Sequence, residues 1–337
     1  MAQIDMTGQE TVQILGTGYY KPARVISNAD LIKIVDTSDE WISTRTGIKE
    51  RRVVEKETAT SDIALLASRN ALERSKVKAR DIDLIIVGTV TPDMLTPSTA
   101  CLIQNALGAV NAAAFDISAG CTGFLYALVT AQKFMLDKSI NKVLVVGAET
   151  LSKVNNWTDR NTCVIFADGA GAMVLGKGAG NNGIISTYLG ADGSGSGLIT
   201  IPAGGSRLPA THATVDGNLH CIKMQGQDVF KFAIQAIPDC AYRVLEQAGL
   251  AVADVDHFVF HQANMRIIES AVKRMNIPME KVLTNIARNG NTSSASVPTV
   301  LAEADEAGII KSGDIVLTVA IGAGLTTGAA IIRWGHD

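Results

Sequence analysis

The segment Thr122-Gly-Phe-Leu-Tyr-Ala-Leu-Val-Thr-Ala-Gln-Lys-Phe-Met-Leu136 decides the fold of this 337-residue chain. Its apolar residues are spread almost all round a helix, whereas a surface helix keeps them on one face. Such a helix is buried on every side, so it needs one layer of structure above it and another below. The segment therefore predicts a layered α/β protein with a helix at its centre.

Short apolar, β-rich runs on both sides of this helix supply the layers. Central strands are predicted over residues 83–88, 142–147, 256–260 and 314–319. Helical spacing predicts amphipathic helices over residues 61–75 and 227–248. The uncharged stretch 315–332 approaches membrane-spanning length, but three glycines interrupt it, so we interpret it as two buried strands around a glycine turn.

Sliding the chain by 173 residues aligns its two parts, so that Asp81-Ile-Asp83 meets Asp254-Val-Asp256. The match is weak letter by letter, and two unrelated helix–turn–strand units could produce it by chance; duplication is the favoured interpretation. The glycine- and asparagine-rich segment 178–183 is the natural seam. We therefore expect an N-terminal half over residues 1–178 and a C-terminal half over residues 179–337.

The composition excludes several classes of protein. With 47% hydrophobic and 19% charged residues, the chain is neither disordered nor fibrous. A net charge of −3 offers no general footprint to a nucleic acid or an anionic membrane. Five cysteines lie far apart with no CxxC motif, and no signal-peptide pattern opens the sequence, which indicates a reduced, cytoplasmic protein.

Common nucleotide and metal motifs are missing. Gly16-Thr-Gly18 lacks the third glycine of a dinucleotide fingerprint, and no glycine-rich loop ends in Gly-Lys-Ser/Thr. The run Gly193-Ser-Gly-Ser-Gly197 has no lysine partner and is typical of a surface loop. His257 and His261 lie on a strand-like run without a third ligand, so no metal site is predicted.

A cysteine stands where the central helix begins, in Phe115-Asp-Ile-Ser-Ala-Gly-Cys121-Thr-Gly123. A helix N-terminus carries partial positive charge, which favours the thiolate and lowers a cysteine pKa below its usual value of about 8.5. Cys121 is thus a candidate nucleophile. The alternative is a small buried hydrophobic residue, which is our interpretation of the other four cysteines.

Two downstream segments complete a chemical set. His261-Gln-Ala-Asn264 directly follows a predicted strand, and Asn289-Gly-Asn291 precedes a predicted helix. Taken singly, a histidine at a strand end is commonly structural and Asn-Gly-Asn is commonly a turn. Loops after strands are where α/β proteins place ligands, however, and together with Cys121 these segments form a Cys/His/Asn set.

At these motifs the chain resembles the thiolase superfamily, and within it the β-ketoacyl-acyl carrier protein synthase III family, over essentially its whole length. The motifs are Asp36-Thr-Ser-Asp-Glu-Trp-Ile-Ser-Thr-Arg-Thr-Gly-Ile48, Gly120-Cys-Thr-Gly123, Thr158-Asp-Arg160, Phe166-Ala-Asp-Gly-Ala-Gly171, His261-Gln-Ala-Asn264, Gly290-Asn-Thr-Ser-Ser-Ala-Ser296 and Gly322-Ala-Gly-Leu-Thr-Thr-Gly328. The resemblance implies a five-layered αβαβα fold made of two duplicated halves. It also implies a homodimer.

The resemblance assigns roles to the catalytic set. Cys121 would accept the acyl group, and His261 with Asn291 would drive decarboxylative condensation. The backbone N–H groups of Cys121 and Ala323 would hold the oxyanion. An asparagine at position 291, where chain-elongating relatives have a second histidine and degradative thiolases have a second cysteine, favours an initiating enzyme.

The resemblance also implies a binding site for coenzyme A (CoA). Trp41, Arg45 and Arg160 match positions that clasp its adenine and phosphates, and Asn264 matches a position that lines the channel to the cysteine. The alternatives are a packed indole and solvated arginines.

The implied function is the initiating condensation of fatty acid synthesis. A short acyl group passes from acyl-CoA to Cys121 and is joined to malonyl-acyl carrier protein with loss of CO2. No cofactor is expected, because acyl-CoA is a substrate. Two alternatives stay open: a secondary-metabolic (polyketide or quinolone-type) condensing enzyme with an unusual starter, and a non-catalytic acyl-CoA-binding member of the family.

The sequence departs from the family where the acyl pocket is formed, which leaves the starter unit open. Ala323 replaces a common glycine, and Leu325 and Thr326-Thr327 replace aromatic residues found in some relatives. Thr96, which resembles a position contributed across the dimer to the partner's pocket, is small.

A basic stripe is expected on the helix after Asn264. Arg266, Ser270, Lys273 and Arg274 follow helical spacing and lie opposite Ile267, Ile268, Ala271 and Met275. An acidic carrier protein could dock there, with Lys231 as a further contact because it matches a docking position in the family. The alternative is an ordinary solvated helix face.

Overall fold

Two β-sheets form the frame of the molecule. A computed structural model describes residues 10–335, so the outermost ends of the two predicted halves, residues 1–9 and 336–337, lie outside the described residues. The first sheet has the order β1 (Glu10–Tyr20), β7 (Asp168–Ala179), β6 (Lys142–Thr150), β4 (Leu84–Gly88), β5 (Ala113–Ile117). The second has the order β11 (His257–Phe260), β12 (Ile315–Gly322), β13 (Thr326–Arg333), β8 (Gly183–Ala191).

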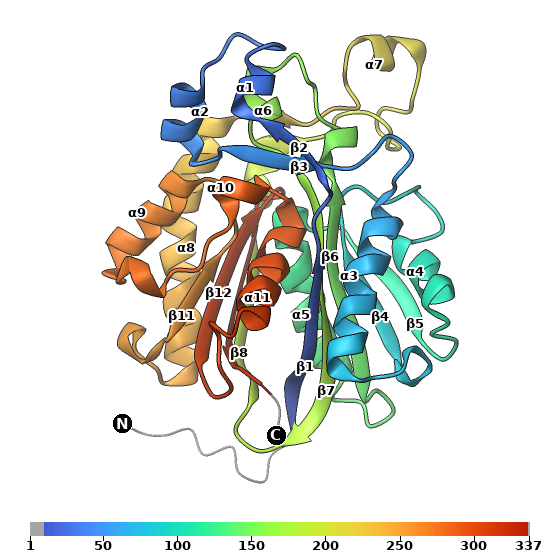
Figure 1. Cartoon of the computed structure of the whole chain (residues 1–337), viewed down its shortest axis with the longest axis vertical. Helices are drawn as coiled ribbons and strands as arrows, with labels where there is room; N and C mark the ends of the chain where they lie inside the picture. The colour runs from blue at the N-terminus through green and yellow to red at the C-terminus, as the bar shows by residue number, and fades with distance from the viewer. Residues whose placement is uncertain (1–9, 336–337) are drawn as a thin grey trace.

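Helices cover both faces of each sheet (Figure 1). Between the sheets lie α5 (Gly123–Phe134) and α11 (Ser296–Glu306). The outer face of the first sheet carries α3 (Thr60–Ser75) and α4 (Thr99–Leu107), and that of the second carries α8 (Gly226–Ala248) and α9 (Met265–Met275). The order of layers is αβαβα, so the predicted fold is confirmed.

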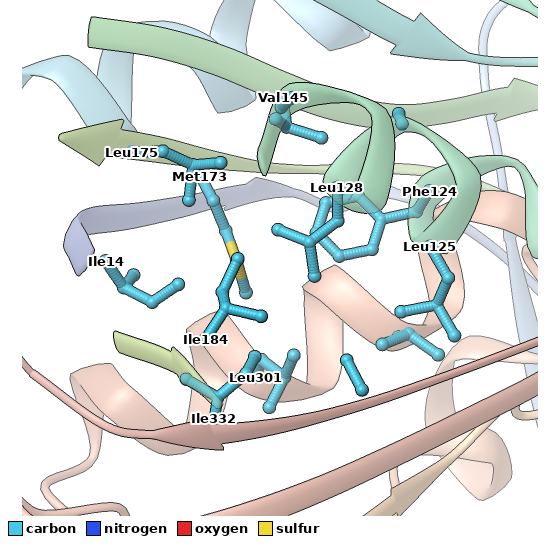
Figure 2. Packing of buried hydrophobic residues seen from close by; sticks show 14 of the residues in the cluster. Ile14, Phe124, Leu125, Leu128, Val145, Met173, Leu175, Ile184, Leu301 and Ile332 are labelled. Carbon is cyan, nitrogen blue, oxygen red and sulfur yellow. The ribbon is translucent and has the colours of Figure 1, made fainter. Parts of the chain in front are cut away.

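The helix predicted over residues 122–136 is α5, and its packing explains the layers. Figure 2 shows Phe124, Leu125 and Leu128 of α5 among side chains from both sheets, and Leu301 of α11 near Ile332 of β13 in the same cluster. Each such side chain contributes about 1.5–3 kcal/mol when fully buried. The helix also needs a glycine on the strand beneath it, because a Cβ on Gly88 would lie 2.3 Å from the carbonyl carbon of Gly123.

The 173-residue offset found in the sequence also relates helices and strands of the structure. It relates the first residues of β4 and β11, of β6 and β12, and of α5 and α11, and the last residues of α3 and α8. Asp83 and Asp256, which the offset aligns, make equivalent hydrogen bonds. Asp83 accepts from the N–H of Lys142 at 2.9 Å, and Asp256 accepts from the N–H of Ile315 at 2.8 Å. Each carboxylate thereby caps the start of the neighbouring parallel strand.

The four predicted central strands are β4, β6, β11 and β12, and the stretch 315–332 forms the antiparallel pair β12 and β13 as expected. In the described part of the chain no helix is long and apolar enough to cross a membrane. The division at residue 178/179 stays a prediction. The short connection from β7, which ends at Ala179, to β8, which begins at Gly183, supports it.

Shorter elements gather at the upper end of Figure 1, where they surround the ends of the central strands. They are α1 (Asn28–Leu31), α2 (Asp39–Thr46), α6 (Arg160–Cys163), α7 (His212–Asp216), α10 (Ile286–Asn289), β2 (Arg24–Ser27) and β3 (Glu50–Val53). The two-stranded sheet of β9 (Ile199–Thr200) and β10 (Lys223–Met224) contacts α6 through β10. The upper end of Figure 1 is also the end of the molecule at which β4, β6, β11 and β12 terminate, so side chains placed just after these strands meet there.

Candidate active site

A cavity of about 750 Å³ joins the predicted residues of the two halves. Cys121, His261 and Asn291 all line it. So do five of the eight residues predicted to contact CoA or the carrier protein: Trp41, Arg45, Lys231, Asn264 and Arg266. A cavity of this size is within the usual range for small-molecule sites.

Cys121 lies in a single 3₁₀ turn, Gly120–Thr122, directly before α5. Two glycines let this turn touch the segment after β12. A Cβ on Gly120 would lie 2.5 Å from the nitrogen of Ala323, and one on Gly322 would lie 2.6 Å from the nitrogen of Cys121. Because no side chain separates them, the backbone N–H groups of Cys121 and Ala323 are near neighbours beside the thiol.

The surroundings of the Cys121 thiol disfavour its ionisation. Burial raises the pKa of Cys121 to about 12, the negative charge of Glu149 acts in the same direction, and a hydrogen bond with the side chain of Ser293 opposes them only in part. The structure thus gives a raised pKa for Cys121 where the helix N-terminus alone favours a lowered one, and desolvation is the largest cause. Formation of the thiolate needs a group that takes the proton.

His261 follows the last residue of β11 and is almost fully buried. Its Nδ1 lies 2.6 Å from the hydroxyl oxygen of Ser296, and that oxygen also accepts a hydrogen bond from the N–H of Gln262 at 3.3 Å. Burial lowers the pKa of His261 to about 3, so the ring is neutral near pH 7. When the hydroxyl of Ser296 donates to Nδ1, the ring of His261 carries its own proton on Nε2.

Asn291 is held by its backbone and oriented by its side chain. Its N–H donates to the carbonyl of Ile165 at 3.0 Å, and its carbonyl accepts from the N–H of Ala167 at 2.9 Å. The side-chain oxygen accepts from the N–H of Ser293 at 2.8 Å, which identifies that atom as the oxygen. The amide NH2 is left to donate to whatever occupies the cavity.

A buried glutamine joins the two segments that carry these groups. Gln262 donates from Nε2 to the carbonyl of Phe260 at 2.6 Å, and its Oε1 accepts from the N–H of Asn285 at 3.0 Å. The end of β11 and the start of α10 are thereby fixed to one another. His261 and Asn291 consequently rest on a single connected support.

The residues predicted to bind CoA lie near the cavity mouth. The guanidinium groups of Arg45 and Arg160 lie over the ring of Trp41, at 5.0 and 4.8 Å from its centroid. Arg160 also donates to the carbonyl of Asp36 at 2.9 Å and, unlike the other three, is not among the residues that line the cavity. Asn264 forms the N-cap of α9, where its side-chain oxygen accepts from the N–H of Arg266 at 2.9 Å.

The predicted basic stripe divides into free and occupied side chains. Arg266 is exposed at the cavity, with its guanidinium 5.4 Å from the ring centroid of Phe230, and Lys273 is exposed farther along α9. Arg274 donates to the carbonyl of Ile234 on α8 at 2.9 Å, and Lys231 pairs with Asp228 at 3.0 Å. The opposite face of α9 is buried as expected.

Three polar residues of the site had no role in the sequence interpretation. Ser293 and Ser296 lie within the motif that ends at Ser296, but only the structure shows which atoms they contact. Glu149 is a charged residue near the end of a largely apolar strand. A charged residue at such a buried position is the one sign in the sequence that Glu149 has a special role. Within residues 10–335 no cluster of three or more His, Cys, Asp or Glu side chains is arranged to hold a metal ion.

Comparison with known proteins agrees with this geometry. Residues 115–193 match the family model described as 3-Oxoacyl-[acyl-carrier-protein (ACP)] synthase III, and residues 245–334 match the model of its C-terminal part. The chain is 57% identical to the β-ketoacyl-[acyl-carrier-protein] synthase III of Caldanaerobacter subterraneus subsp. tengcongensis, over 95% of this chain and 97% of that protein.

Solved structures give the same result. The crystal structure of 3-oxoacyl-[acyl-carrier-protein] synthase III from Aquifex aeolicus VF5 matches with a TM-score of 0.88 and 44% identity, covering 96% of this chain and all of that one. The priming β-ketosynthase of the R1128 polyketide biosynthetic pathway matches with a TM-score of 0.90 and 36% identity, over 97% of both chains.

Proposed function

Because the chain belongs to the 3-oxoacyl-[acyl-carrier-protein] synthase III family, we propose that Cys121, His261 and Asn291 carry out its two half-reactions in the cavity described above. The protein is an acyltransferase and the initiating condensing enzyme of fatty acid synthesis. Its substrates are an acyl-CoA and malonyl-acyl carrier protein. The observation that carries the assignment of residues is the meeting of all three side chains in one cavity.

In the first half-reaction the thiolate of Cys121 attacks the thioester carbonyl of acyl-CoA. The carbonyl oxygen becomes an oxyanion, which the N–H groups of Cys121 and Ala323 hold. Their nearness rests on Gly120 and Gly322. Collapse of the intermediate expels the CoA thiolate and leaves the acyl group on the cysteine. Each donor of such a pair is worth roughly 2.7–4 kcal/mol in other acyl-transfer sites.

In the second half-reaction malonyl-acyl carrier protein replaces CoA. Loss of its carboxylate as CO2 puts negative charge on the thioester oxygen, and Nε2–H of His261 and the amide of Asn291 donate to it. The neutral state of His261 suits this role, because the ring keeps a donor on Nε2 while Ser296 occupies Nδ1. The resulting carbanion attacks acyl-Cys121 and releases the β-ketoacyl product and the free cysteine.

Trp41, Arg45, Arg160 and Asn264 are the proposed CoA contacts. The guanidinium of Arg160 lies 4.8 Å from the ring centroid of Trp41. An adenine ring stacked between the indole and the guanidinium would need a separation of about 7 Å, so the present position of Arg160 leaves no space for it. Adenine would therefore displace Arg160 from the indole and exchange one cation–π contact for stacking. Asn264 would meet the arm that passes from the cavity mouth to Cys121.

We further propose that the protein is a homodimer in the cytoplasm. The edge strand β5 is only partly covered, and apolar side chains around it are exposed, including Leu95 at 87% and Val110 at 74%. A second copy of β5 would satisfy the unpaired backbone groups of the edge. Thr96 lies in the same exposed region, where a partner could receive it.

The proposed location in the cytoplasm rests on the five cysteines, all of which are free thiols, because free thiols fit a reducing compartment.

The starter unit is the open part of the function, and intact-mass measurement with a panel of acyl-CoAs identifies it. We expect one acyl group per chain from acetyl-CoA or another short acyl-CoA, followed by its loss and release of CO2 when malonyl-acyl carrier protein is added. A chain that accepts only an unusual acyl group, or that condenses with malonyl-CoA, would belong with the priming enzymes of secondary metabolism. A chain that stays unmodified by every acyl-CoA would be a binding protein.

Carrier-protein docking is proposed on Arg266 and Lys273, with Lys231 and Arg274 as further contacts. Arg266→Glu combined with Lys273→Glu is expected to raise the KM for malonyl-acyl carrier protein about tenfold, since each exposed contact is worth up to about 1 kcal/mol. The salt dependence of that KM should become flatter. Steady-state kinetics at two salt concentrations measures both effects.

Lys138→Glu combined with Lys311→Glu is the matched control. Both lysines are exposed, and they lie after α5 and before β12, at the end of the molecule opposite Cys121. The control makes the same change in net charge and should leave KM unaltered. Equal effects of the two double variants would assign the stripe to the ordinary solvated surface.

A further inference from the structure

Arg51 is a buried arginine that has no part in the two half-reactions above. It lies on β3 and has no exposed surface. Within residues 10–335 it forms no ion pair with an aspartate or glutamate, and its Nε has no hydrogen-bond partner. Burial lowers the pKa of Arg51 to about 10, so the guanidinium stays charged near pH 7. A buried charge without a counter-charge lowers stability, which favours a role beyond that of holding the fold together.

The guanidinium of Arg51 joins two regions that are far apart along the chain. Nη1 donates to the carbonyl of Ile26 on β2 at 3.1 Å. Nη2 donates to the side-chain oxygen of Asn28 on α1 at 2.8 Å, and to the carbonyl of Val164, directly after α6, at 3.0 Å. All three acceptors are neutral. The planar group therefore fixes the directions of these contacts and compensates no negative charge.

Asn28 extends this connection to α2. Its Nδ2 donates to the carboxylate of Asp39, the first residue of α2, at 2.7 Å, and to the carbonyl of Ile48, two residues after the helix ends, at 2.9 Å. Both ends of α2 are thereby attached to the amide that accepts from Arg51. Because α2 bears two of the proposed CoA contacts, their position depends on Arg51 through one intervening residue.

The other contact of Arg51 reaches the segment that follows Arg160 and supports Asn291. The acceptor of this contact directly follows α6, whose first residue is Arg160. The next residue, Ile165, accepts from the N–H of Asn291 at 3.0 Å. A Cβ on Gly290 would lie 3.0 Å from the Cβ of Arg51, so the stem of the arginine also packs against the residue before Asn291. Arg51 is thus connected to both sides of the proposed CoA site and to the support of a catalytic side chain.

We propose that Arg51 is a positioning residue that holds α2 and α6 at a fixed separation and keeps both aligned with Asn291. The proposal rests on the assignment of the CoA contacts and of Asn291 given above. Adenine has to displace the side chain of Arg160 from the ring of Trp41, and a fixed backbone lets that side chain move while the two helices stay in place. The same alignment serves the second half-reaction after CoA has left.

Arg51→Lys tests the connection, because lysine keeps the positive charge but replaces the planar group by a single ammonium. The first readout is the rate of acylation of Cys121 by the short acyl-CoA that the parent accepts, and by the N-acetylcysteamine thioester of the same acyl group, which lacks adenine and phosphates. Intact mass measures both. At low concentration, acylation by acyl-CoA should fall at least about tenfold, since small displacements of a positioning group have effects of this size. Acylation by the short thioester should stay that of the parent.

The second readout is release of labelled CO2 from malonyl-acyl carrier protein by enzyme that the short thioester has already acylated. Arg51→Lys should lower this rate at least about tenfold, because the support of Asn291 is displaced. Asn28→Asp breaks the contact with α2 alone: it keeps an acceptor for Arg51 but places a second carboxylate against Asp39. It should slow acylation by acyl-CoA as strongly and leave the release of CO2 unchanged.

A merely structural Arg51 predicts a different pattern. Arg51→Lys would then lower the melting temperature and slow acylation by both thioesters to the same extent. That result, parent rates throughout, or an equal loss of CO2 release in Asn28→Asp would each overturn the proposal. Should Arg51→Lys fail to fold, Asn28→Asp decides the question, because a parent rate of acylation by acyl-CoA in that variant refutes the connection to α2.

Arg52→Lys is the matched control. Arg52 is the next residue on β3 and is partly buried, and its contacts are with Glu50 at 3.5 Å and with the carbonyl of Pro22 at 3.4 Å. The same substitution there should leave all three rates at those of the parent. A parent enzyme that neither thioester acylates would refute the proposed function itself, whereas rates that are indifferent to Arg51 and Asn28 refute only this inference.

Discussion

Replacing Cys121 with alanine is expected to abolish acylation of the chain by acyl-CoA. Of the five cysteines, all of which lie in the described part of the chain, Cys121 is the one that lines the cavity. Without the thiol no acyl-enzyme forms, so the rate of β-ketoacyl product formation should fall at least about 10⁴-fold. Intact-mass measurement after incubation with acyl-CoA detects the missing acyl group directly.

Cys101→Ala is the control for this experiment. Cys101 lies exposed on α4, so general reactivity toward thioesters would be found there first. The variant should be acylated like the parent. Cys163 and Cys240 are buried and do not line the cavity, so acyl-CoA has no access to their thiols. Peptide mapping that located the acyl group on any cysteine other than Cys121 would contradict the assignment.

The layers of the fold could be predicted because they depend on local periodicity. A segment that is apolar all round must be buried, and α5 is buried between two sheets. The two parts of the chain share few identical residues, but their helices and strands begin or end at positions related by the same offset. Asp83 and Asp256 are the reason: each caps a neighbouring strand, a role that preserves the residue while the surrounding side chains change.

The membership of the site could be predicted more readily than its electrostatics. Cys121, His261 and Asn291 were found from motifs at strand and helix ends, and these positions converge in a layered fold. The pKa of the thiol could not be deduced in this way. A sequence shows that a cysteine precedes a helix, but the degree of desolvation depends on segments such as residues 322–325, which are distant along the chain.

Hydrogen-bond partners could not be predicted from periodicity either, because they come from segments that are distant along the chain. Helical spacing places Arg274 on the exposed face of α9, yet it cannot reveal that the guanidinium reaches the carbonyl of Ile234 on α8. The hydrogen bond from Ser294 to Glu149, 2.8 Å long, joins residues from the two predicted halves. Both groups belong to regular elements or motifs in the sequence, and only the packed structure gives them a chemical neighbour.

His261→Ala and Asn291→Ala should each separate the two half-reactions. Their donors serve the enolate, so decarboxylation of malonyl-acyl carrier protein is expected to fall by about 10²–10³-fold, whereas acyl transfer to Cys121 continues. The double variant should lose less than the product of the two single losses, because both donors address one oxygen. Release of labelled CO2 from the pre-acylated enzyme measures the second half-reaction, and intact mass measures the first.

Asn291→Asp makes the test sharper. Alanine at position 291 leaves the buried N–H of Ser293 without its acceptor, at a cost to stability of about 1–3 kcal/mol. Aspartate keeps that acceptor but replaces the donor with a negative charge, so it should suppress decarboxylation at least as strongly while the chain remains folded. Undiminished release of CO2 by Asn291→Asp or His261→Ala would remove that residue from the mechanism.

His261→Ala also shows whether the histidine takes the proton of the nucleophile. If His261 were the base, His261→Ala would lose acylation together with decarboxylation. The backbone donors of Cys121 and Ala323 and the side-chain donors of His261 and Asn291 belong to one site but act on different oxygens, so each half-reaction should respond to its own pair of donors alone.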